Sequence, residues 1–280
     1  TYNFVHLFKG AFLCNNKNSN IIFNGTFGQT LFSEVMSFQK FMCLEENGNG
    51  DFQTWCDLLV STGDSSRKTK ALDCSLQKVT EERADYFKSQ GYETIGRYIT
   101  NEGGTLDKEL EQYEIDNIFS RGMSIFPIYQ TYGHLAEHFT YENGYNDAKK
   151  AINIAKMKYG IPTGTTIYFP VDYDAYQYEV ESSIKSYFEG VNAAFGSYNG
   201  YYIGVYGARN TCSIISNYGL AKYSFVSGMS IGFSGNLGYP MPSNWSFNQI
   251  YEDYELGIDN DVKSGRDNGF SKQEFVSINN

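Results

Sequence analysis

The chain of 280 residues lacks any run of 18 or more apolar residues, so no membrane-spanning helix is expected. Positive charge is also scarce, because 22 Lys and Arg stand against 32 Asp and Glu and the net charge is −10. An acidic surface argues against a nucleic-acid groove, which requires clusters of Lys and Arg, so binding to nucleic acid is not expected. The excess negative charge falls in residues 71–280, whereas the charges of residues 1–70 balance.

Cysteine is rare and irregularly spaced, with five residues at positions 14, 43, 56, 74 and 212. An odd number without regular spacing predicts neither a disulfide framework nor a zinc knuckle, and it leaves the redox compartment open. No phosphate-binding glycine loop and no Ser/His/Asp pattern in a recognisable context is present, so no cofactor is expected. No signal peptide is visible; because the chain starts at Thr1, we interpret it as a fragment or a mature form.

A polar segment divides the chain into two predicted domains, residues 1–63 and residues 71–280. Residues 61–70 contain no large apolar side chain and are typical of a linker. Before the linker, three short helices are expected at residues 5–13, 31–42 and about 54–59. The second of these carries an apolar stripe with helical spacing, which consists of Leu31, Val35, Phe38 and Met42.

The second predicted domain alternates strand-like and helix-like segments. Strands are expected at residues 71–74, 94–100, 124–130, 165–172, 201–206, 224–228, 246–250 and 257–262. Helices are expected at residues 80–90, 106–120, 146–159, 179–195 and 209–218. This alternation predicts an α/β fold, a (β/α)8 TIM-type barrel, with a doubly wound sheet as the competing architecture. The last two units lack clear helices, so the barrel is expected to be degenerate there.

Two carboxylates, Asp172 and Asp174, stand at the end of the fourth predicted strand. Because side chains alternate along a strand, these two are expected on one face, roughly 7 Å apart. Two like charges at this separation raise the pKa of one of the two groups. Paired carboxylates at a strand end are suited to acid/base cleavage of a sugar bond. A solvated strand end and half of a metal site are the alternatives. Pro170 cannot donate to a strand ladder, and a bulge there would redirect Asp172.

The first domain carries a second, longer pattern. Its residues are Asn24-Gly25-Thr26-Phe27-Gly28-Gln29-Thr30, Val35, Phe38-Gln39, Leu44, Gly50, Thr54-Trp55 and Leu58-Leu59. This spacing resembles the peptidoglycan-binding repeat, a small three-helix module, although Asn24 stands where that family usually has an acidic residue. The resemblance implies a module that holds cell-wall glycan or peptide and has no chemistry of its own. A helical cap on the barrel is the alternative.

The second domain also resembles a known family. The matching stretches are Ala71–Cys74, Gly96–Ile99, Ile167–Asp174, Ile203–Gly207 and Gly257–Asp259. They resemble the glycoside-hydrolase-like barrels first catalogued as a domain of unknown function, which are distant relatives of the lysozyme-type muramidases. The resemblance implies an acidic site at the C-terminal ends of the strands. It also implies a peptidoglycan hydrolase that is secreted or associated with the cell wall.

The resemblance assigns roles to the two carboxylates of the fourth strand. In the muramidases this strand ends in Asp-x-Glu and the Glu is the general acid, which implies the same role for Asp174; Asp172 would orient the substrate's acetamido group or stabilise charge at the anomeric carbon. Asp174 is one methylene shorter than Glu, and a displacement of about 1 Å costs on the order of 100-fold in rate. A non-catalytic wall-binding protein is therefore the alternative function. A route in which the acetamido group is the nucleophile is a further alternative.

Other residues at predicted strand ends would complete the site. Asp73 and Asp259 are expected to close the acidic mouth, with capping or turn roles as the alternatives. The residues expected to contact a substrate are Arg97, Tyr98, Gln130, Tyr206 and Gln249. Arg97 would either offset the acids or pair with one of them.

One further motif, His134-Leu135-Ala136-Glu137-His138, matches the H-x-x-E-H pattern of a metallopeptidase class. On a helix, His134 and His138 would share a face and could hold zinc, with Glu137 as the base. The motif follows a predicted strand here, so we expect a loop over the barrel mouth and no metal.

Overall fold

A computed structural model of the chain describes residues 2–15, 20–196 and 200–276. Eight strands form a closed barrel in sequence order, which confirms the TIM-like α/β barrel and rejects the doubly wound sheet. The strands are β1 (Ala71–Cys74), β2 (Thr94–Tyr98), β3 (Ser124–Ile128), β4 (Thr166–Pro170), β5 (Tyr202–Gly207), β6 (Tyr223–Val226), β7 (Trp245–Asp253) and β8 (Ile258–Lys263).

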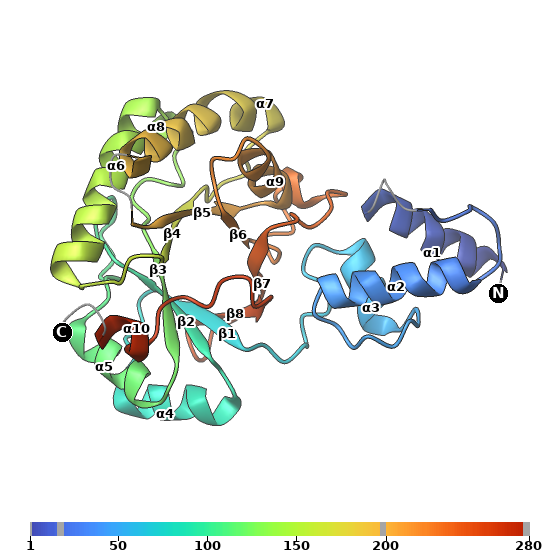
Figure 1. Cartoon of the computed structure of the whole chain (residues 1–280), viewed down its shortest axis with the longest axis horizontal. Helices are drawn as coiled ribbons and strands as arrows, with labels where there is room; N and C mark the ends of the chain where they lie inside the picture. Colours follow the sequence, from blue (N-terminus) through green and yellow to red (C-terminus); the bar gives the residue numbers. More distant parts are fainter. Residues whose placement is uncertain (1, 16–19, 197–199, 277–280) are drawn as a thin grey trace.

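Helices surround these strands, as Figure 1 shows. They are α4 (Glu81–Gln90), α5 (Gln112–Ser120), α6 (Tyr141–Asn153) with the π-helical turn η2 (Ile154–Lys158), α7 (Gln177–Glu179) with η3 (Val180–Ile184), α8 (Lys185–Gly196), α9 (Arg209–Asn217) and α10 (Lys272–Val276). Two 3-10 turns, η1 (Ala136–His138) and η4 (Ser234–Asn236), lie in loops. None of the described helices has the length and hydropathy needed to cross a bilayer.

The last strand runs against the others. β8 pairs antiparallel with both β7 and β1, and a turn at residues 254–257 replaces the helix between β7 and β8. The barrel was expected to be degenerate in its last units, and the departure from a regular barrel there is the inversion of β8. Because β8 is inverted, its first residues lie at the barrel end where the other strands finish.

Aromatic side chains fill the inside of the barrel. A buried cluster contains Ala71, Phe126, Ile128, Tyr168, Phe225 and Phe247, and the rings of Phe126 and Phe247 stack with centroids 4.1 Å apart. A barrel of this strand number has an interior that side chains fill, so it is a packed core and no pore. Any site of this domain must therefore lie at an end of the barrel.

Three helices precede the barrel and lie on the side of β7 in Figure 1. They are α1 (Tyr2–Asn15), α2 (Gln29–Phe41) and α3 (Phe52–Leu59), close to the three helices that were expected. Their own core consists of Phe8, Ala11, Phe12, Ile21, Leu31, Val35 and Leu58. The N-terminus of α3 is capped by Asp51, whose side chain accepts the N–H of Thr54 at 2.9 Å.

These helices pack directly against the barrel. Met42, the last residue of the predicted apolar stripe, belongs to the barrel's core. The indole Nε1 of Trp245 at the start of β7 donates to the carbonyl of Phe41 at 3.2 Å. The guanidinium of Arg266 lies 5.1 Å from the ring centroid of Phe41 and 5.4 Å from that of Trp245. A hydroxyl of the linker, Ser61, donates to the carbonyl of Gly228 at 2.7 Å.

Two glycines allow α6 and α8 to cross closely. A Cβ atom on Gly144 would meet the backbone of Tyr187, and one on Gly190 would meet the backbone of Tyr141. We expect Gly190→Ala to lower the free energy of unfolding by about 2 kcal/mol, because the helices would have to separate. Gly196→Ala at the end of α8 is the control: its Cβ would meet no atom within 4 Å, so it should be neutral or slightly stabilising. Equal urea midpoints for the two variants would contradict the prediction.

Candidate active site

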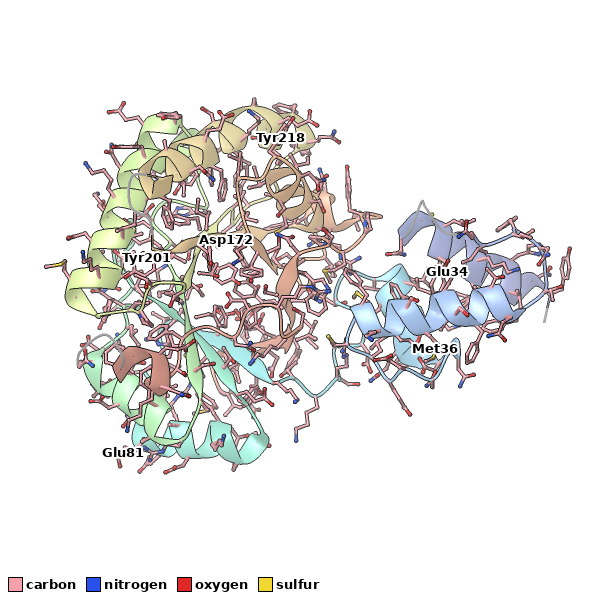
Figure 2. All side chains as sticks on the ribbon, viewed as in Figure 1. Glu34, Met36, Glu81, Asp172, Tyr201 and Tyr218 are labelled. Atoms are coloured by element: carbon pink, nitrogen blue, oxygen red, sulfur yellow. The ribbon has the colours of Figure 1, made fainter. Side chains whose placement is uncertain are left out.

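A cavity of about 190 Å³ opens at the barrel end where β1 to β7 finish. It is lined by Tyr98, Ile128, Gln130, Pro170, Asp172, Tyr206, Phe225, Met229, Ser230, Gln249 and Asp259. Six of the residues predicted for the site are among these. Figure 2 shows Asp172 among the strands at the centre of the barrel, whereas Glu81 lies on the outer helix α4.

Asp73 and Asp259 share one hydrogen-bond donor. The two residues are register neighbours on β1 and β8, and Nε2 of Gln249 donates to Asp73 at 2.7 Å and to Asp259 at 3.2 Å. The hydroxyl of Tyr206 donates to Oε1 of Gln249 at 2.8 Å, which fixes the orientation of the amide.

Burial favours the protonated form of both carboxyl groups, although the hydrogen bond from Gln249 lowers the pKa of Asp73 and opposes the effect there. Burial raises the pKa of Asp73 to about 7, and the charge of Asp172 adds to the effect. Burial raises the pKa of Asp259 to about 8, with a further contribution from the neighbouring Asp73. A carboxyl group with a pKa near the working pH is suited to general acid catalysis.

Asp172 is placed by the segment that follows β4. The backbone N–H of Val171 donates to the carbonyl of Tyr206, and that of Asp172 donates to the carbonyl of Gly133, both at 2.8 Å. Nε2 of Gln130 donates to Oδ2 of Asp172 at 3.0 Å. The carboxylate is therefore oriented by both its backbone and a neighbouring amide.

A lysine that the sequence did not predict supports this amide. Nζ of Lys108 donates to Oε1 of Gln130 at 2.9 Å and lies 4.3 Å from the ring centroid of Tyr98. Burial lowers the pKa of Lys108, although the charge of Asp172 opposes the shift. Lys108 lies in the segment before α5 that was expected to be helical, so no strand-end signal marked it.

Asp174 does not line the cavity. β4 ends at Pro170, so the strand stops before Asp172 and Asp174, and the prediction that both lie on one face of an extended strand is wrong. Oδ1 of Asp174 instead accepts two hydrogen bonds from Ser234, from its N–H at 2.6 Å and from its hydroxyl at 2.7 Å.

Arg97 lies on the outer side of the barrel wall. Its side chain is 0% exposed and pairs with Glu114, with Nε and Nη2 each 3.0 Å from a carboxylate oxygen. The expectation that Arg97 contacts a substrate is wrong, because its neighbour Tyr98 faces the cavity and adjacent strand residues face opposite sides. It does form an ion pair, but with Glu114 of α5 and not with an acid of the mouth.

Asp259 reaches the mouth from the direction opposite to the one expected. It was expected at the end of the last strand, but it is the second residue of the inverted β8.

Asp261 lies two residues further along the same face of β8 and is 0% exposed. Neither of its carboxyl oxygens has a hydrogen-bond partner among the described residues. Burial, and then the charges of Asp73 and Asp259, raise the pKa of Asp261 well above its ordinary value. The two-residue spacing from Asp259 is the feature of the sequence that could have predicted that Asp261 lies on the same face of the strand.

The H-x-x-E-H motif does not form a helix. Its last three residues make the short turn η1, so His134 and His138 do not share a helical face. Nε2 of His138 lies 2.8 Å from Oδ2 of Asp147, which also accepts the hydroxyl of Tyr187 at 2.8 Å. Within the part of the chain that the structure describes, no three His, Cys, Asp or Glu residues are grouped so that they could hold a metal ion.

Active sites of closed β/α barrels lie at this end of the strands, and glycoside hydrolases use paired carboxyl groups. Residues 85–266 match the family model described as the Rv2525c-like, glycoside hydrolase-like domain, and the chain belongs to this family. The matched range includes Asp172 and Asp259, whereas Asp73 on β1 precedes it. Residues 1–59 match a second model, the FadG/YbfG, PGDB-like domain.

Two curated proteins of Bacillus subtilis (strain 168) are similar over almost the whole chain. The uncharacterized protein FadG is 46% identical over 286 residues, which cover 99% of this chain and 49% of FadG. The uncharacterized protein YbfG is 43% identical over 285 residues, covering 96% of this chain and 39% of YbfG. The chain thus spans half or less of the length of these relatives.

A solved structure shares the barrel. The crystal structure of the Mycobacterium tuberculosis Tat-secreted protein Rv2525c in complex with L-tartrate superposes with a TM-score of 0.60 at 20% sequence identity. The match covers 72% of this chain and 99% of that one. A likeness at this identity supports the fold.

Proposed function

We propose that the barrel binds an amino-sugar glycan of the bacterial cell wall, peptidoglycan, and hydrolyses its glycosidic bond. The observation that carries this proposal is the group of three carboxyl groups at one cavity, Asp73, Asp172 and Asp259. A glycosidase needs one carboxyl group that holds a proton and one carboxylate beside the scissile bond. The Asp73–Asp259 pair retains a proton at neutral pH, because the pKa values of its members are about 7 and about 8.

The geometry suggests a division of roles. Asp259 lines the cavity and would donate its proton to the glycosidic oxygen, while Asp73 lies deeper and is 2% exposed. Asp172 would stabilise positive charge at the anomeric carbon or orient the acetamido group of the substrate. The side chains of Tyr98, Gln130, Tyr206 and Gln249 would contact the sugar ring and its hydroxyl groups. Asp174 is not assigned the role of acid, because its carboxylate is bound to Ser234.

We further propose that the protein acts outside the cell, secreted or associated with the cell wall. The described secretion of Rv2525c by the Tat route supports this proposal. Residues 1–63 would form a module that holds cell-wall glycan or peptide next to the barrel, residues 71–280. The direct packing of α2 against β7 would keep the two parts at a fixed separation.

A non-catalytic glycan-binding protein is the second candidate. The resemblance to the muramidases supports it: the residue that the resemblance implies as the general acid, Asp174, is bound to Ser234 and does not line the cavity. In that case the cavity would hold a sugar without cleaving it.

The test is mass spectrometry of fragments released from purified cell walls by the wild type and by Asp172→Asn. We expect the wild type to release fragments with reducing-end sugars, with a rate that falls as the pH rises through about 8 and Asp259 loses its proton. Asp172→Asn should release none and still bind the wall. Binding by both forms without release would support the second candidate. Neither binding nor release would overturn both.

A further inference from the structure

The loop of residues 227–244, between β6 and β7, forms one wall of the cavity. Met229 and Ser230 of this loop line the cavity. The backbone N–H of Met229 donates to the carbonyl of Gln249 on β7 at 2.8 Å. Together these contacts set one side of the space that a ligand would occupy.

An asparagine inside the loop fixes its fold. Nδ2 of Asn236 donates to the carbonyls of Ser227 and Ser230, at 2.9 and 3.0 Å. Oδ1 of Asn236 accepts the backbone N–H of Arg209 at the start of α9, at 2.9 Å. The loop is therefore a compact unit that is attached to the barrel on the α9 side.

Asp174 attaches the same loop from the β4 side. Its carboxylate accepts the N–H and the hydroxyl of Ser234, the first residue of η4. Hydrogen bonds to an ionised acceptor are about twice as strong as neutral ones. Asp172, two residues earlier in the same segment, lines the cavity, so one short segment carries both a site carboxylate and the attachment of the 227–244 loop.

We propose that Asp174 is a positioning residue whose carboxylate holds the 227–244 loop, and so sets the width of the cavity between Asp172 and Met229. This inference rests on the proposed function of the cavity. A Glu at this position would carry its carboxylate one methylene further from the backbone, so it could not keep both contacts to Ser234 without a shift of the side chain or the loop.

The first experiment measures hydrogen exchange of the backbone amides of residues 228–238 in the full chain. We expect exchange to become about 10-fold faster in Asp174→Ala and a few-fold faster in Ser234→Ala, since each removes hydrogen bonds to the loop. Asp174→Asn keeps an acceptor oxygen and should stay within about 3-fold of the wild type. The matched control is Asp253→Ala, which removes a carboxylate that accepts the N–H groups of Glu255 and Leu256 in another mouth turn. It should leave the loop unchanged.

The second experiment measures binding and cleavage of a chitin oligosaccharide, a soluble amino-sugar glycan, by the same variants. We expect the Kd or KM of Asp174→Ala to rise about 10-fold while kcat changes little, and Asp174→Asn to be close to the wild type. The double variant Asp174→Ala/Ser234→Ala should be no weaker than Asp174→Ala, because the two residues share one interaction.

The outcomes separate the positioning role from its rivals. A collapse of kcat in both Asp174→Asn and Asp174→Ala, with Ser234→Ala active, would make Asp174 the acid and overturn the proposal. Unchanged exchange in Asp174→Ala would also overturn it. A wild type that binds neither the chitin oligosaccharide nor purified cell walls overturns the proposed function, while the exchange data still decide whether Asp174 holds the loop.

Discussion

Arg97→Met is expected to lower the free energy of unfolding by about 3–5 kcal/mol, the usual effect of breaking a buried ion pair. The side chains of Arg97 and Glu114 are both 0% exposed. Without Arg97, Glu114 would remain as a buried carboxylate, helped by the N–H groups of Val79 and Glu111 at 2.8 Å each. Urea denaturation at neutral pH measures the loss.

Two further variants make this prediction specific. Arg97→Met/Glu114→Gln removes the stranded charge and keeps an acceptor oxygen for one of the two backbone N–H groups, so it should recover part of the lost stability. Arg121→Met breaks a pair of similar geometry with Asp85, whose side chain is 66% exposed, and should lower stability far less than Arg97→Met does. A double variant no more stable than Arg97→Met would show that the charge of Glu114 is not the cause.

Asp261→Asn is expected to leave stability near pH 4 unchanged and to raise it relative to the wild type at pH 8. The pKa of Asp261 in the folded protein lies well above its value of about 3.9 in an unfolded chain, because the group is buried without a partner. The folded state therefore binds a proton that the unfolded state releases, and stability falls as the pH rises above about 4. Asn cannot ionise, so the variant lacks this contribution to the fall of stability with rising pH.

Thermal unfolding from pH 4 to pH 8 tests this prediction. The pKa values of Asp73 and Asp259 are also raised, to about 7 and about 8, so both residues lower stability as the pH rises to those values. The stability of Asp261→Asn should therefore still fall with pH, but with a smaller slope than that of the wild type. Asp107→Asn is the control: its exposed side chain has a pKa lowered by hydrogen bonds from Asn101 and Lys78, and the variant should gain no stability at pH 8. Parallel curves for Asp261→Asn and the wild type would contradict the prediction.

Most of the fold follows from local pattern, but the direction of β8 does not. The positions of the eight strands were predictable from apolar runs and the helices between them. The two-residue period of a strand is the same in either chain direction, so the segment from Ile258 to Lys263 carries no local mark of its inversion. The inverted strand still brings Asp259 to the mouth, because its start lies where the other strands end.

The residues of the cavity were predictable where a side chain lies at or just after a strand end, as for Tyr98 and Gln130, whereas Gln249 lies within β7, which is longer than expected. Arg97 was assigned wrongly although the alternation of strand side chains would have separated it from Tyr98. Asp174 could not be placed from sequence, because its partner Ser234 lies 60 residues away in a loop without regular structure.

The pairing of β1 with β8 determines when the carboxyl groups of Asp73 and Asp259 can lie side by side. Asp73 and Asp259 face each other across the pairing of the first and last strands of the barrel. During synthesis the ribosome releases β1 long before β8, and strand pairings between distant residues are slow to form. In a nascent chain the two carboxyl groups are therefore far apart, and they come together only when β8 pairs with β1 and closes the barrel.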